Sequence, residues 1–171
     1  METKNLRAEM KNRRKVIYDK IAYEKSLENH LREINRFSLK EISASDLLSV
    51  EKTIEYFDKC WYSEPKVSYR FKILFAEKKS EKFTQYLQKL YELNSSSGYL
   101  WSKFSRIYGG CIFSSILQIN MNFDFVCIKR GEVTFRTIDL YDELLLDFFE
   151  EEGQRWLTVR ASGPHWSKPC W

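Results

Sequence analysis

The spacing of apolar residues changes along this chain from a helical period to a strand period, and that change restricts the folds open to it. From Val67 to Phe75, apolar and polar residues alternate, which is typical of a strand with one buried side. Over residues 3–37 the apolar positions recur mostly three, four or seven residues apart, as on one side of an amphipathic helix. That stripe consists of Leu6, Met10, Ile17, Ile21, Leu27, Leu31 and Ile34.

Two more helices are predicted on either side of this strand. Ser43 or Ser45 is a suitable N-cap for a second helix, which Pro65 prevents from continuing. Ser80 is a suitable N-cap for a third helix, which ends at the loop of residues 94–98. The front of the chain is therefore predicted to be mainly helical.

The second half favours strands, with one exception. Residues 99–104 predict a short strand, and residues 111–127 predict either one bent strand or a hairpin that breaks near 120–122. Arg130-Gly131 is predicted to be a hairpin turn between strands 123–128 and 133–138, and residues 154–161 form a last strand. Residues 141–150 are predicted to form a short acidic helix, with Leu144, Leu145 and Phe148 turned inward.

Together these elements predict an α+β fold: N-terminal helices followed by a mainly antiparallel sheet with helices packed on one face. A length of 171 residues suits a single domain spanning 1–171, and 6 Gly and 3 Pro leave few breaks in regular structure. Residues 1–20 are predicted to be a protruding helix because their apolar stripe is thin. Residues 162–171 are predicted to be an irregular tail, whose Trp166 and Trp171 pack back on the sheet or form a contact patch.

Charge is distributed unevenly behind a formal net charge of +4. Seven basic residues lie between Lys4 and Lys20 against two acidic ones, whereas seven acidic residues lie between Asp139 and Glu152 with no basic one. Such asymmetry bears on partners and encounter rates more than on fold. The acidic and basic segments could also neutralise each other within one molecule, or pair between the subunits of a homodimer.

The acidic segment leads to the first functional hypothesis. Carboxylates bordered by aromatic side chains are typical of a surface that attracts and anchors a basic protein. We therefore expect a non-enzymatic, cytoplasmic protein-binding module, in its most concrete form an inhibitor of the immunity or antitoxin type that binds a basic, nuclease-like toxin. The predicted partner-binding residues are Asp139, Tyr141, Asp142, Glu143, Asp147, Phe149, Glu150, Glu151 and Glu152.

Two alternatives belong to other functional classes. In the first, the basic N-terminal helix binds nucleic acid by contacting phosphates and releasing counterions, through Lys4, Arg7, Lys11, Arg13, Arg14 and Lys15. In the second, the chain is a small acyltransferase-like enzyme. Arg106, Gly109 and Gly110 would then lie at its ligand, because adjacent glycines can present backbone N–H groups to an anion. That loop resembles the pyrophosphate loop of acetyltransferases, from which its glycine spacing departs, and a tight turn or a bulge between strands is the favoured explanation.

Other chemistries have little support in the sequence. The chain has two histidines, His30 within the first predicted helix and His165 in the tail, and we expect neither to be catalytic. No spacing of Cys and His suggests a zinc site, and no metal or cofactor is expected. The four cysteines lack a C-x-x-C pair, and Cys60, Cys111 and Cys127 are predicted to be buried thiols of a reduced compartment. Neither a signal peptide nor a membrane span is predicted.

Overall fold

The computed structural model describes the chain except for residues 1–25, 63–66, 103, 125–129 and 170. It confirms the predicted α+β class: six strands form one antiparallel sheet in the order β1-β6-β5-β4-β2-β3. The strands are β1 (Ser68–Leu74), β2 (Gly98–Trp101), β3 (Cys111–Phe113), β4 (Arg130–Thr137), β5 (Glu143–Glu151) and β6 (Gln154–Ser162). The four consecutive neighbours β1, β6, β5 and β4 form the long part of the sheet, and the short β2 and β3 extend it at one side.

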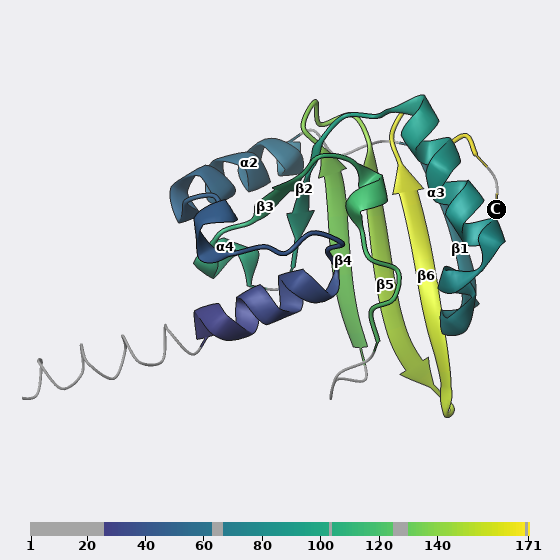
Figure 1. The fold of residues 1–171 in the computed structure, drawn as a ribbon. Coiled ribbons are helices and arrows are strands. Elements are labelled where there is room, and N and C mark those ends of the chain that lie inside the picture. The colour runs from purple at the N-terminus through teal and green to yellow at the C-terminus, as the bar shows by residue number, and fades with distance from the viewer. Residues whose placement is uncertain (1–25, 63–66, 103, 125–129, 170) are drawn as a thin grey trace, which may run out of the picture.

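Two helical segments cover one face of this sheet, in front of it in Figure 1. They are residues 26–36, which belong to the first predicted helix, and α3 (Glu81–Leu93). A third helix, α2 (Val50–Tyr62), lies over the β2 end of the opposite face, where Tyr56 stacks against Tyr99 with ring centroids 4.2 Å apart. The shorter elements are α4 (Ser105–Tyr108), η1 (Ala44–Asp46), η2 (Phe75–Lys79) and η3 (Ile116–Gln118).

The hydrophobic core lies between the sheet and the two covering helical segments. Alternate residues of neighbouring strands point into it, as the period of two requires. Buried aromatic side chains of the connecting segments also belong to it. The strand residues include Ile73, Phe135, Leu144, Leu146, Phe148, Leu157, Val159 and Ala161, and the helix residues include Ile34, Phe83, Leu87 and Leu90. We call this side of the sheet the covered face.

The C-terminal tail packs against the covered face, in agreement with the first of the two predicted placements. Trp166 is completely buried, stacks on Phe135, and donates its Nε1–H to the Leu90 carbonyl over 2.8 Å. Asp142, also buried, accepts the backbone N–H groups of His165 and Trp166. Trp171 stacks on Phe71 with ring centroids 5.1 Å apart. The tail therefore supplies part of the core.

Three local predictions are wrong. The second helix begins at Val50, because Ser43 and Asp46 instead cap the short η1. Arg130 and Gly131 are paired residues of β4, and the turns that join β4 to β5 and β5 to β6 lie further along the chain. Between residues 111 and 124, only Cys111–Phe113 belongs to a strand of the sheet, and η3 interrupts the alternating pattern.

The predicted acidic helix at 141–150 is also wrong, since β5 occupies this segment. Leu144, Leu146 and Phe148 are buried at a period of two, whereas Leu145 and Phe149 point to the other face. The turn into β6 explains why a strand is possible here. Glu152 and Gly153 both adopt positive φ, 52° and 77°, as the two central residues of a tight hairpin turn do.

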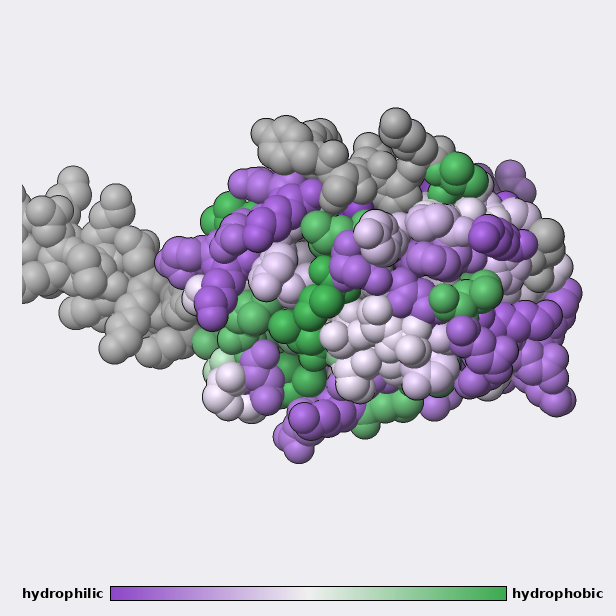
Figure 2. Space-filling model, turned by 90° about the horizontal axis from the view of Figure 1, so that it is seen from above, coloured by the Kyte–Doolittle hydropathy of each residue, from purple (hydrophilic) through white to green (hydrophobic). Residues whose placement is uncertain are grey.

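Seen from above, hydrophilic residues cover much of the surface, and hydrophobic residues form a narrow band in its left half besides a few smaller patches (Figure 2). Exposed isoleucines of the α2, α4 and β3 end are Ile54, Ile107 and Ile112. Within the described part of the chain, no helix combines the length and the apolar character needed to cross a bilayer.

Candidate functional site

The predicted acidic surface does not form as one patch. Asp139 and the exposed Tyr141 lie in the turn between β4 and β5, whereas Glu151 and Glu152 lie at the opposite end of β5. A strand rises about 3.3 Å per residue, so the nine residues of β5 hold the two groups roughly 25–30 Å apart. The expectation of a single negative face rested on a helix, which would have kept these side chains much closer.

Several carboxylates of the acidic segment are paired with basic side chains or buried. Glu143 bonds to Arg136 and Arg160, while Glu150 and Glu151 face Arg155 at 3.8 Å and Lys72 at 3.2 Å. Asp142 and Asp147 are buried, and Phe149 is half-buried with the Lys72 ammonium 4.9 Å from its ring centroid. Of the nine predicted partner-binding residues, only Asp139, Tyr141, Glu150, Glu151 and Glu152 are exposed, at the two ends of the strand.

The residues predicted to bind nucleic acid, Lys4 to Lys15, lie outside the described residues. The glycine loop is described, and it is a tight turn. The Gly109 N–H bonds to the Ser105 carbonyl, and the Gly110 N–H bonds to the Thr53 hydroxyl over 3.0 Å. Gly109 has a φ of 100°, which favours glycine. Both N–H groups are used within the fold, so this loop does not present them to an anion.

The two histidines lie in different parts of the structure. His30 is buried rather than on a helix surface, and its Nε2 lies 2.7 Å from the Gly109 carbonyl. Burial lowers the pKa of His30, against the opposing effect of that hydrogen bond, so the neutral ring is favoured. His165 instead places its Nδ1 2.7 Å from Asp142 and helps to fasten the tail. The structure therefore does not bring the histidines together.

The cysteines that the structure describes fit the prediction. Cys60 and Cys111 are buried free thiols, and burial raises both pKa values, that of Cys111 to about 12. Cys127 and Cys170 lie outside the described residues. Among those described, no three His, Cys, Asp or Glu side chains are grouped as metal ligands would be.

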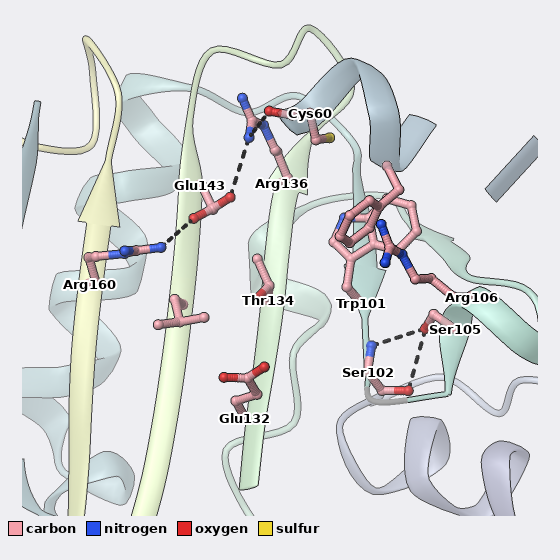
Figure 3. Close-up of a pocket in the computed structure, with 12 residues that line it drawn as sticks. Cys60, Trp101, Ser102, Ser105, Arg106, Glu132, Thr134, Arg136, Glu143 and Arg160 are labelled. Carbon is pink, nitrogen blue, oxygen red and sulfur yellow. Dashed lines mark hydrogen bonds and ion pairs between the residues drawn. The ribbon is translucent and has the colours of Figure 1, made fainter. Parts of the chain in front are cut away.

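A pocket of about 470 Å³ lies on the face of the sheet opposite the covered face, and Figure 3 shows its lining. We call this face the open face and the cavity the arginine pocket. Strands β4, β5 and β6 form the floor, and α2, β2 and α4 form the wall. The lining residues are Phe57, Cys60, Trp101, Ser102, Ser105, Arg106, Glu132, Thr134, Arg136, Glu143, Leu145 and Arg160.

An ion network holds the floor of the arginine pocket in place. Glu143 lies between Arg136 and Arg160, at 3.4 Å and 3.1 Å from their guanidinium nitrogens, as Figure 3 shows. Arg136 is 3% exposed and also donates to the carbonyls of Cys60 and Leu140, which ties α2 and the β4–β5 turn to the sheet. Register explains the cluster, because Arg136 pairs with Glu143 on β5 and Arg160 lies on the next strand, β6.

Two other arginine groups in this pocket keep hydrogen-bonding capacity. The Arg106 guanidinium lies 3.4 Å above the Phe57 ring and forms no ion pair with any of the described residues. The Nε–H of Arg160 is buried and has no hydrogen-bond partner among them. A buried donor without an acceptor costs about 1–3 kcal/mol. Three arginines against Glu132 and Glu143 leave the pocket with an excess of one positive charge.

The arginine pocket is not apparent from the sequence. Its charged members on β4, β5 and β6 are Glu132, Arg136, Glu143 and Arg160, and those on different strands lie 7 to 28 residues apart along the chain and meet only through strand register. A usable signal was the alternation of polar and apolar residues in 132–136, which places Glu132, Thr134 and Arg136 on one face of a strand. No protein-family model, curated protein or solved structure matches this chain significantly.

Proposed function

We propose that this chain is a non-enzymatic protein-binding module, and that the arginine pocket receives an acidic side chain of its partner. The observation that supports this proposal is the surplus of guanidinium donors at Arg106 and Arg160 within one concave site. A carboxylate accepts such donors in short, charge-assisted hydrogen bonds, and Arg is the residue best suited to bind it in a planar geometry.

Aromatic side chains around the pocket support a protein partner. Trp101 and Phe57 form one wall, and Trp156 and Phe149 lie half-buried further along the open face, next to Leu74. Interface hot spots are enriched in Trp, Tyr and Arg that lie at the centre of a patch with a polar rim. The open face thus has aromatic and aliphatic side chains that a partner could contact, next to the charged arginine pocket.

The carboxylates on the floor argue for a single acidic group rather than a nucleic-acid backbone. Glu132 is exposed at the pocket and Glu143 occupies its centre, so a row of phosphates would meet like charges there. One carboxylate can instead bond to Arg106 or to the Nε–H of Arg160 and avoid both. The nucleic-acid alternative through Lys4 to Lys15 stays a prediction, which a gel-shift assay at low salt can check.

The immunity- or antitoxin-type role with a basic toxin also stays a prediction. It was based on one continuous acidic face, whereas the carboxylates of β5 lie at its two ends or are paired. In our proposal the partner is still a protein, but the arginine pocket replaces the acidic surface, and the recognised group is acidic rather than basic. We also propose a cytoplasmic location, which two buried free thiols, Cys60 and Cys111, support.

The first test is a random-peptide display selection on the immobilised full chain. We expect the selected peptides to carry Asp or Glu next to an aromatic residue. Their dissociation constants, measured by fluorescence anisotropy, should rise about tenfold or more with Arg160→Met, since a hydrogen bond to a charged group contributes about 1.5–3 kcal/mol. Arg106→Met should weaken binding in the same direction.

The matched control is Arg32→Met. Arg32 lies exposed in the helical segment 26–36, away from the pocket, and bonds only to Glu28 among the described residues. Its removal should leave peptide affinity unchanged. Peptides that bind Arg160→Met and Arg106→Met as tightly as the wild type would contradict the proposal. Selection of Lys- or Arg-rich peptides that lose affinity with Glu132→Gln would overturn it in favour of a basic partner.

A further inference from the structure

A second cavity, of about 440 Å³, lies at the other end of the molecule and contains a buried lysine. Lys78 belongs to η2, which follows β1 directly, and only 2% of its surface is exposed. The cavity is lined on one side by Leu74 and Ala76 and on the other by the segment containing Phe123. We call it the lysine cavity.

The ammonium of Lys78 is held by aromatic rings rather than by an acid. Its Nζ lies 4.2 Å from the ring centroid of Phe75 and 4.8 Å from that of Phe123. It forms no ion pair or hydrogen bond with any of the described residues. Cation–π contacts of this kind offset only part of the cost of taking an ammonium out of water without a counter-ion.

The other charged residues of the cavity do not supply that counter-ion. Asp124 is the one acidic residue among the described lining residues; it is 70% exposed, and Arg155 binds it at 3.1 Å. Lys79 adds a further positive charge at the rim. Three cations against one carboxylate leave an excess of two positive charges around a cavity of limited size. Burial, together with the charge of Lys79, lowers the pKa of Lys78 to about 8, against the attraction of Asp124.

We propose that the lysine cavity binds a small organic anion, whose carboxylate or phosphate group accepts hydrogen bonds from the Lys78 ammonium. The apolar body of this ligand would lie against Leu74 and Ala76, because the ring faces of Phe75 and Phe123 are already occupied by the lysine. The anion provides the missing counter-charge, and hydrogen bonds between charged groups are stronger than those between neutral ones. The site is independent of the arginine pocket.

Benzoate and benzamide test the proposal as a matched pair, because they share shape and differ in charge. Isothermal titration of the full chain near neutral pH should show saturable binding of benzoate and at least about tenfold weaker binding of benzamide. Inorganic phosphate, titrated in the same way, shows whether an anionic group suffices without an apolar body. Equal affinity for benzoate and benzamide, or no binding of benzoate and phosphate, would overturn the proposal.

The variant that tests the lysine is Lys78→Met, which removes the charge and nearly keeps the length. It should lower benzoate affinity about 10- to 100-fold, whereas Lys89→Met, on the exposed side of α3, should not change it. Benzoate affinity that persists in Lys78→Met would contradict the assignment. A soak of wild-type crystals with 4-bromobenzoate gives a readout that needs no variant: anomalous scattering should place the bromine in the lysine cavity, and bromine found only elsewhere would refute the site.

Discussion

The two faces of the sheet differ although they are built from the same strands. On the covered face, β6 presents Leu157, Val159 and Ala161, all fully buried. On the open face the intervening residues are Trp156, Thr158 and Arg160, of which the first and last are partly exposed. Because successive side chains of a strand point to opposite sides, each strand contributes alternate residues to stability and to a polar, partly hydrated surface. Burial on the covered face stabilises the fold, whereas the side chains of the open face are accessible to other molecules.

The two faces also satisfy their polar groups differently. On the covered side, Trp166 donates to the Leu90 carbonyl and Asp142 accepts from the tail. On the open face, Glu143 is shared by two arginines, and the Nε–H of Arg160 has no partner among the described residues. A hydrogen-bond donor that lacks an acceptor beside a cavity makes the open face a candidate binding surface.

The sharpest test of this division substitutes two neighbouring leucines of β5. Leu146 is fully buried on the covered face, and Leu146→Ala should lower the free energy of unfolding by about 3–5 kcal/mol, because it leaves a cavity in the core. Leu145 is half-buried in the arginine pocket, and Leu145→Ala should cost only about 1 kcal/mol. Urea denaturation measures both. Equal losses would show that the two faces are not distinct in stability.

A second pair compares two glutamates of the open face. Glu143 is 14% exposed, and Glu143→Ala should lower the free energy of unfolding by about 3 kcal/mol, because it leaves Arg136 buried without its carboxylate. Glu132 is exposed on the neighbouring strand, so Glu132→Ala should change stability by less than about 0.5 kcal/mol. Thermal denaturation at constant salt separates the two. A small effect of Glu143→Ala would mean that the ion network does not hold the pocket floor.

The covered face was largely predictable from the sequence. The alternation in 67–75 gave β1, the cap at Ser80 gave α3 with its side chain accepting the Phe83 N–H, and the apolar residues of 154–161 gave β6. These signals are local: a period of two or a cap can be read within ten residues. Even the burial of Trp166 followed from the cost of leaving a large aromatic side chain in water.

The acidic segment shows why the rest was not predictable. The residues Glu143 to Glu151 contain apolar pairs that fit a helical stripe through Leu144, Leu145 and Phe148 as well as a strand through Leu144, Leu146 and Phe148. Pairing with β4 on one side and β6 on the other stabilises the strand, and the apolar spacing within the segment does not show that pairing. The arginine pocket depends on the same strand register. Lysine is usually an exposed residue type, and Lys78 is buried only by tertiary packing.

Lys78 is an exception to the difference between the faces, because its charged side chain packs among aromatic rings of the apolar core. The pH dependence of stability measures the free-energy cost of burying this ammonium. Its pKa is lowered to about 8, so between about pH 8 and its ordinary value of 10.5 the unfolded chain binds more protons than the folded one. Stability should therefore rise with pH across this window, by about 2 kcal/mol at Lys78.

The raised pKa values of Cys111 and Tyr99 act in the opposite sense, and Lys79, Asp124 and Arg155 also face the cavity. All of these are retained in Lys78→Met, so the difference in unfolding free energy between wild type and Lys78→Met, measured by urea denaturation at each pH, isolates the lysine. A difference that stays flat from pH 7 to pH 10.5 would mean that the Lys78 ammonium is hydrated and that the core on this side contains no buried charge.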